Sequence, residues 1–139
     1  MASFPSAEWV SAYKDAINGN PEYKAGGANW DKGVVALLCK ARPEVGILED
    51  VGIWLDLHKG ECRDARIVTA AEALTAPFCI TGEYARWKQV IRKELDPITG
   101  MMRGALRLKG DLPTIVRYVA ASKALVQSAG MVATEFPDD

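Results

Sequence analysis

The sequence of 139 residues predicts one α+β domain, with four to five helices on one face of a five-stranded, largely antiparallel sheet. Two observations lead to this class. Some segments repeat apolar residues at helical spacing, whereas five others are continuous or alternating apolar runs, as in strands. The predicted order is two helices, four strands, a helix, a strand and a last helix. Short turns between consecutive strands favour an antiparallel meander.

Two helices are predicted at the N-terminus. The first follows Ser6, a favoured N-cap residue, and ends at Asn18-Gly19. Its apolar residues fall on one face: Trp9, Val10, Tyr13 and Ile17. Asn20-Pro21 starts a second, short helix, which Gly26-Gly27 stops.

Four strands follow these helices. The continuous apolar run 33–40 is typical of a strand covered on both faces. Segment 51–58 alternates, with four apolar residues on one face: Val51, Ile53, Leu55 and Leu57. Lys59-Gly60-Glu61 forms a hairpin turn to a strand at 62–69, and Phe78 and Ile80 lie in the fourth strand.

The C-terminal third begins with a helix over 83–95, for which Thr81 is the expected cap. Met101 and Met102 are expected on a turn before a short strand at 105–109. Asp111 then caps a single long last helix. We expect the folded core to span about 7–128 of a single domain covering 1–139, and residues 131–139 to be loosely held.

Composition excludes several classes of protein. A net charge of −1 argues against a nucleic-acid-binding module. No apolar run approaches the roughly 18 residues of a membrane span, and no secretory signal is visible. Cys39, Cys62 and Cys79 lack metal-ligand spacing and are expected to be buried thiols in a reducing environment. The expectation is a soluble, cytoplasmic protein without a metal or other cofactor.

The stretch from Asp96 to Asp111 resembles the signature of the sterol carrier protein domain family. It contains Asp96-Pro97, then Met102-Arg103-Gly104, then a strand that ends at Gly110-Asp111. The resemblance extends over roughly residues 9–125 and implies a stand-alone domain with an apolar lipid tunnel between sheet and helices. Three features depart from the family pattern: Glu94 replaces a common Gly, Pro77 a common Asp, and the C-terminus lacks Ser-Lys-Leu.

The expected tunnel is lined or gated by apolar residues of the last third. Met101 and Met102 can repack around ligands of different shapes, and Trp87 and Ile91 form a helical stripe nearby. Six further residues are expected in the wall: Phe78, Ile80, Leu106, Leu108, Ile115 and Val119. The alternative is that these residues are ordinary core, and the many small residues of the last helix allow either close packing or room for a ligand.

Little in the sequence suggests catalysis. His58, the one histidine, falls on the strand face opposite the apolar residues, without a Ser or Cys motif. The sequence therefore favours non-enzymatic, intracellular binding or transfer of an apolar lipid: a fatty acid, acyl thioester, or sterol- or isoprenoid-like molecule. One alternative is an accessory interaction subunit of a lipid or quinone biosynthesis enzyme, and a weaker one is an enzyme acting on acyl thioesters.

Partners beyond the lipid are expected to be few. A cluster of cations in the C-terminal half can attract an anionic headgroup or membrane surface, although the simpler interpretation is a solvated face: Arg86, Lys88, Arg92, Lys93, Arg103, Arg107 and Lys109. We expect at most transient membrane contact and no nucleic acid. A homodimer is compatible with the sequence.

Overall fold

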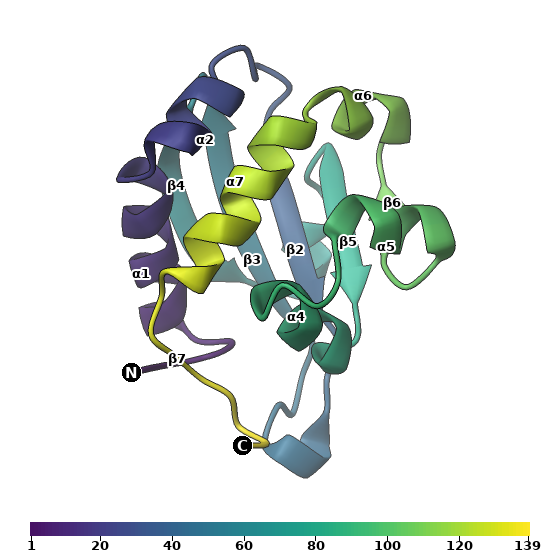
Figure 1. The fold of residues 1–139 in the computed structure, drawn as a ribbon. Helices are drawn as coiled ribbons and strands as arrows, with labels where there is room; N and C mark the ends of the chain where they lie inside the picture. The colour runs from purple at the N-terminus through teal and green to yellow at the C-terminus, as the bar shows by residue number, and fades with distance from the viewer.

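A five-stranded mixed sheet forms the centre of the computed structural model, which describes residues 1–139 (Figure 1). In the spatial order β4-β3-β2-β5-β6, its strands are β4 (Glu61–Val68), β3 (Val51–His58), β2 (Val35–Cys39), β5 (Phe78–Gly82) and β6 (Arg107–Lys109). Three of the four pairings are antiparallel, which confirms the predicted sheet. The predicted meander ends at β4, because β5 runs parallel to β2 and pairs with it.

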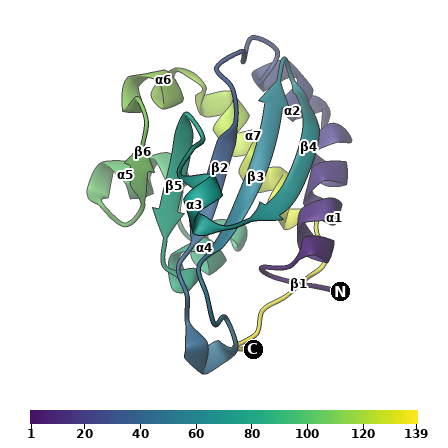
Figure 2. The ribbon, with the colours of Figure 1, turned by 180° about the vertical axis from the view of Figure 1, so that it is seen from behind.

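The connection between β4 and β5 accounts for this parallel pairing. It contains α3 (Ala70–Ala73) and crosses the back of the sheet, so that β5 returns beside β2 (Figure 2). A small second core lies there, made of six buried residues: Ala36, Leu38, Val68, Ala73, Ala76 and Cys79. The structure therefore adds a short helix on the face expected to carry none, because the apolar back of the central strands needs cover.

The other helices lie at the β6 edge or over the front face of the sheet, which is the face opposite α3. They are α1 (Ala7–Asn18), α2 (Pro21–Gly26), α4 (Tyr84–Ile91), α5 (Pro97–Arg103), α6 (Leu112–Arg117) and α7 (Val119–Gly130). α7 crosses the sheet between α1 and α2 on one side and α4 and α5 on the other (Figure 1). The main core of 27 buried residues fills the space beneath. No helix combines the length and apolar character needed to cross a bilayer.

Several helix ends follow the sequence signals. Ser6 Oγ accepts a hydrogen bond from Trp9 N–H at 3.1 Å and starts α1. Asn20 caps α2, and Asp111 caps α6. Thr81 is not a cap: it lies inside β5, paired with Arg107, and α4 begins at Tyr84. α4 also ends earlier than predicted, at Ile91, two residues before Lys93 adopts a left-handed backbone (φ 63°).

Two further elements differ from the sequence-based prediction. Met101 and Met102 lie in α5, not on a turn, because Asp96 accepts a hydrogen bond from Thr99 N–H and caps a helix that starts at Pro97. The predicted last helix is divided into α6 and α7 at Tyr118. There the Tyr118 ring packs edge-on against Trp30, with centroids 4.9 Å apart, a contact far away in sequence.

Both chain ends are fixed to the domain. β1 (Ala2–Ser3) pairs in parallel with β7 (Thr134–Glu135), and we call residues 1–5 and 131–139 the terminal strap. Phe4 and Phe136 are buried and pack against each other. The tail therefore differs from the loosely held segment that was expected, because its aromatic side chain joins the main core.

Leu106 joins β5, α5 and the start of β6. Its side chain is 1% exposed and fills the space that two glycines leave open. A Cβ on Gly82 would lie 2.5 Å from one Leu106 methyl carbon, and a Cβ on Gly100 would lie 3.1 Å from the other. The absence of side chains at Gly82 and Gly100 thus makes room for Leu106.

Replacing Leu106 with Ala is expected to lower the free energy of unfolding by about 2–5 kcal/mol, because it leaves a cavity between Gly82 and Gly100. Urea denaturation followed by circular dichroism measures this loss. Met102→Ala is the matched control, because Met102 is 67% exposed and should change stability by no more than about 0.5 kcal/mol. Equal effects of the two variants would contradict the assigned packing.

Asp138 is expected to make the stability of the strap depend on pH. The Tyr84 hydroxyl donates to Asp138 Oδ1 at 2.7 Å and the Lys88 ammonium donates to it at 2.9 Å, and both hold the pKa of Asp138 below its ordinary 3.8. A carboxyl with a lowered folded-state pKa stabilises the fold above pH 3.8, and this contribution is lost as the pH falls through the folded-state pKa.

Asp138→Asn should therefore unfold at lower urea concentration than the natural protein at pH 7, and the gap should close below pH 3.8. Urea midpoints measured across this pH range test the expectation. Asp15→Asn, which removes an exposed carboxylate of α1 that makes no ion pair, is the control and should leave the urea midpoint at pH 7 close to that of the natural protein. A gap for Asp138→Asn that is unchanged at pH 3 would show that the contact does not act through charge.

Candidate functional site

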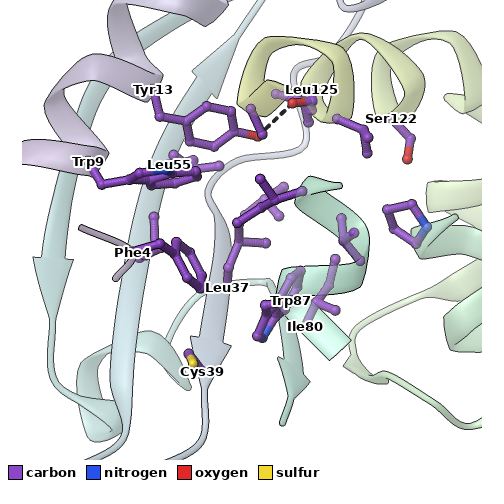
Figure 3. Close-up of a pocket in the computed structure, with 17 residues that line it drawn as sticks. Phe4, Trp9, Tyr13, Leu37, Cys39, Leu55, Ile80, Trp87, Ser122 and Leu125 are labelled. Carbon is purple, nitrogen blue, oxygen red and sulfur yellow. Dashed lines mark hydrogen bonds between the residues drawn. The ribbon is translucent and has the colours of Figure 1, made fainter. Parts of the chain in front are cut away.

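Two adjoining apolar cavities lie between the sheet and α7. The first has a volume of about 80 Å³, and 15 of its 17 lining residues are hydrophobic (Figure 3). Its walls come from the strap, α1, the central strands, α4, Pro97 and α7: Phe4, Trp9, Tyr13, Val35, Leu37, Cys39, Ile53, Leu55, Ile80, Trp87, Val90, Ile91, Pro97, Ser122, Leu125, Val126 and Ala129.

The second cavity lies nearer α2 and α6 and has a volume of about 60 Å³. It shares five lining residues with the first: Val35, Ile80, Pro97, Ser122 and Leu125. Its other walls are Tyr23, Trp30, Leu57, Met101, Ile115, Tyr118 and Ala121. The shared residues make the two cavities neighbours, separated only by side chains.

The regular spacing of residues along α7 and the strands places the side chains that line the cavities on one face of each element. On α7, Ser122, Leu125, Val126 and Ala129 follow the i, i+3, i+4, i+7 pattern of one helical face. Across from them, alternate residues of β2 and β3 point to the same side of the sheet, and the first cavity takes Val35, Leu37 and Cys39 from β2. The cavity is thus enclosed between one helical face and one sheet face.

The polar atoms of the walls are largely engaged within the protein. Tyr13 OH donates to Leu125 O at 3.0 Å, Trp9 Nε1 to Thr134 Oγ1 at 2.9 Å and Trp87 Nε1 to Leu38 O at 3.0 Å. The Ser122 hydroxyl, on the wall of both cavities, makes no side-chain hydrogen bond. Apart from this hydroxyl the site offers mainly apolar surface, which suits a ligand with an apolar body.

The walls also remain uncharged over the ordinary pH range. Burial, with smaller contributions from the charges of Asp50 and Glu83, raises the pKa of Cys39 to about 12. Burial also raises the pKa of Tyr13. Because a thiol or a phenol reacts as a nucleophile mainly in its anionic form, both groups act here as neutral wall atoms.

Five of the predicted wall residues line the cavities. Trp87 and Ile91, both on α4, contribute to the first. Met101 and Ile115 contribute to the second, and Ile80 to both. The structure thus brings together residues from α4, α5, α6 and β5.

The other five predicted wall residues lie elsewhere. Phe78 is buried against Trp30, with ring centroids 5.3 Å apart, and Leu106 is packed between two glycines. Leu108 is half-buried against the core. Met102 and Val119 are on the outer surface, 67% and 39% exposed. None of these five lines either cavity.

Sequence reasoning missed the contribution of the N-terminal third. Phe4, Trp9 and Tyr13 line the first cavity, and Tyr23 and Trp30 line the second. The apolar stripe of α1 was visible in the sequence, but it indicated only a buried face. Nothing local distinguishes a side chain that packs against protein from one that borders a cavity.

The one histidine of the chain is not brought to the cavities. His58 lies at the end of β3, opposite Glu61 in the hairpin, and lines neither cavity. No group of three or more His, Cys, Asp or Glu side chains is placed to hold a metal ion.

The segment that forms α5, β6 and α6 carries an excess of cations, and we call its four cationic residues, Arg103, Arg107, Lys109 and Arg117, the cationic edge. Segment 97–122 carries Arg103, Arg107, Lys109 and Arg117 but only one acidic residue, Asp111. All four cations are exposed, and none takes part in an ion pair, since the nine ion pairs involve other residues. This segment therefore has a net charge of +3, whereas the rest of the chain has −4.

Known proteins share this architecture. A family model described as the SCP-2 sterol transfer family matches residues 15–123. No curated protein sequence matches the chain. Among solved structures, a crystal structure of sterol carrier protein 2 is 34% identical, with a TM-score of 0.85 over 92% of this chain and 98% of that one.

Two further structures extend the comparison. A protein from Thermus thermophilus, described as possibly a sterol carrier protein, is 33% identical, with a TM-score of 0.84 over 94% of this chain and 90% of that one. The ubiquinone synthesis protein UbiJ-SCP2 is 15% identical, with a TM-score of 0.52 over 89% of each chain, and is similar in fold.

Proposed function

The chain belongs to the SCP-2 sterol transfer family, and we propose that it binds an apolar lipid between its sheet and α7 and carries it without chemical change. The family implies lipid binding or transfer. The observation that supports this site is the pair of adjoining apolar cavities under α7. Within the proposal, the ligand is an intracellular fatty acid, acyl thioester, or sterol- or isoprenoid-like molecule.

Lipid uptake requires the cavities to merge and widen. Their volumes of about 80 and 60 Å³ are well below the roughly 300–1,000 Å³ of sites that enclose a drug-sized ligand. Rotation of the shared side chains Ile80 and Leu125 would join them, and a small outward movement of α7 would enlarge them. Each methylene of the lipid contributes about 0.8 kcal/mol on burial, which offsets the cost of such rearrangement.

The chemical groups of the side chains that line the cavities support lipid binding rather than catalysis. Ser122 has no histidine or other base beside it on the cavity walls, and the Cys39 thiol is neutral because its pKa is about 12. An acyl-transfer enzyme needs an activated nucleophile.

A second candidate function is that of an interaction subunit of a lipid or quinone biosynthesis enzyme. An open groove beside β3 and β4 exposes Leu48 (74%) and Ile67 (37%), next to the acidic Glu49, Asp50 and Glu72. Exposed apolar side chains in a groove are typical of contact surfaces. Co-purification of such an enzyme, lost in Leu48→Ser/Ile67→Ser, would favour this candidate over a free carrier.

We also propose that lipid exchange involves transient contact of the cationic edge with anionic membranes. Met102 and Val116 are exposed on α5 and α6, which also carry Arg103 and Arg117. Apolar side chains among cations suit the interface of an anionic bilayer.

Filling the cavities should weaken lipid binding while the fold persists. Ser122→Phe places a ring where the two cavities meet, and should reduce affinity for a fluorescent fatty acid by at least about tenfold, the equivalent of two lost methylenes. Fluorescence titration measures the affinity, and circular dichroism checks folding.

Ala120→Phe is the matched control, because Ala120 is exposed on the same helix. It should bind the fatty acid as the natural protein does. Native mass spectrometry of the natural protein provides an independent measurement: a chain that takes up no fatty acid, sterol or isoprenoid under any condition would refute the carrier function.

Neutralising the cationic edge should weaken membrane binding. Arg107→Gln/Arg117→Gln should bind vesicles of phosphatidylserine and phosphatidylcholine about thirtyfold more weakly, because each cation near an anionic surface contributes about 1 kcal/mol. Vesicle co-sedimentation at low salt measures this. Arg63→Gln/Arg66→Gln, on β4 and outside the edge, is the control. Equal losses for both pairs would exclude a specific edge.

A further inference from the structure

A polar cleft lies along α7, lined by Glu22 of α2 on one side and by residues 93–97, between α4 and the start of α5, on the other. It is open to solvent, has a volume of about 330 Å³, and has only two hydrophobic residues among eight. Its charged residues are Glu22, Lys93, Asp96 and Lys123. We call it the α7 cleft.

The α7 cleft and the first cavity share two of their wall residues. Pro97 at the start of α5 and Val126 on α7 line both. On one side of these two residues the surroundings are polar and solvated, and on the other they are apolar and enclosed. A molecule that passed between Pro97 and Val126 would therefore have a polar end outside and an apolar end inside.

Lys93 is held against the end of α7 by an unusual backbone. Its φ of 63° lies in the left-handed region that favours glycine. A Cβ on Gly130 would lie 3.2 Å from Lys93 Cε and 3.7 Å from Nζ, so the side chain extends along the last residue of α7. Lys123 is seven positions before Gly130 on the same helical face, about 10 Å along the axis.

Of the four charged side chains of the α7 cleft, only that of Asp96 makes a hydrogen bond within the protein. Asp96 accepts a hydrogen bond from Thr99 N–H at 2.9 Å, and so its carboxylate compensates the N-terminus of α5. Lys93 and Lys123 make neither an ion pair nor a side-chain hydrogen bond, although carboxylates line the same cleft. Glu22 is also unpaired and opposes the lysines from α2. Two ammonium groups are thus free to meet an anion.

We propose that the α7 cleft binds the anionic headgroup, a carboxylate or phosphate, of a lipid whose chain lies in the first cavity, with Lys93 and Lys123 as its ligands. This assignment rests on the proposed lipid-binding function and narrows the ligand to anionic amphiphiles. Pro97 and Val126 are then the two residues between which the chain passes. Glu22 and Asp96, the two carboxylates of the cleft, limit the affinity for the headgroup by repulsion.

The test compares charged and uncharged ligands of one chain length. Dodecanoate, dodecyl phosphate and dodecanol each displace a fluorescent fatty acid from the natural protein and from Lys93→Gln/Lys123→Gln. The double variant should bind the two anions about fivefold more weakly than the natural protein does, as expected for the loss of two partly exposed charge pairs. Its affinity for dodecanol should be unchanged. High salt should reduce the difference. Glu22→Gln should shift anion affinity in the opposite direction.

Lys59→Gln/Lys32→Gln is the matched control, because Lys59 is also an exposed lysine with positive φ (48°) and neither residue lines the α7 cleft. It should bind all three ligands normally. Equal binding of anions and dodecanol by all variants would overturn the headgroup site while leaving lipid binding intact. Failure of the natural protein to bind any of them would instead refute the carrier function itself.

Two further outcomes also overturn the assignment. If Lys93→Gln lowers stability but not the preference for anions, the ammonium acts only on the C-terminal dipole of α7. Inorganic phosphate, which has no chain, should not displace the fatty acid. Displacement by phosphate alone would assign the cleft to a free anion.

Discussion

The buried side chain of Asn20 fixes the position of α7, and the cavities depend on that position. Asn20 is 3% exposed, caps α2 through Oδ1 and donates from Nδ2 toward Ala124 O, Gln127 Oε1 and Ser128 Oγ at 3.0–3.3 Å. Gly26 brings the α2 backbone so close to α7 that an added Cβ would lie 3.0 Å from Ala120 C. Together with the Tyr13–Leu125 hydrogen bond, these contacts attach one side of α7 firmly to α1 and α2.

The opposite side of α7 is held much less tightly. Toward α4 and α5 it borders the open, polar cleft and the first cavity, and Val126 and Pro97 line both of these spaces. An outward rotation of α7 about its α1 and α2 side would break few hydrogen bonds, because Asn20 and Tyr13 lie near the axis of rotation. If the proposed lipid uptake moves α7, this asymmetry of contacts favours an opening between α7 and α5, beside Lys93 and Lys123.

Features that depend on neighbouring residues were predicted well from the sequence, whereas features that depend on long-range contacts were not. Ser6, Asn20 and Asp111 cap helices through hydrogen bonds within three residues, so the sequence was sufficient to place those helix starts. The parallel β2–β5 pairing and the break at Tyr118 depend on contacts with distant residues. The cavity walls were only partly predicted for the same reason: Trp87 and Met101 were identified near the family signature, whereas Trp9 and Tyr13 looked like ordinary core. Whether a residue borders empty space depends on all of its neighbours together.

A lipid would interact with three separate parts of the molecule: the cavity walls, the α7 cleft and the cationic edge. These interactions differ in how they depend on salt and pH. The cavity walls are neutral over the ordinary pH range, since the pKa of Cys39 is about 12, so their contribution depends on buried area and not on salt or pH. Apolar walls also discriminate poorly between chains that differ by a methylene. Selectivity and salt dependence must therefore come from charged groups. Those nearest the chain are in the α7 cleft, whereas the cationic edge acts on a whole membrane surface. A salt dependence of lipid affinity measured without membranes consequently reports the cleft alone.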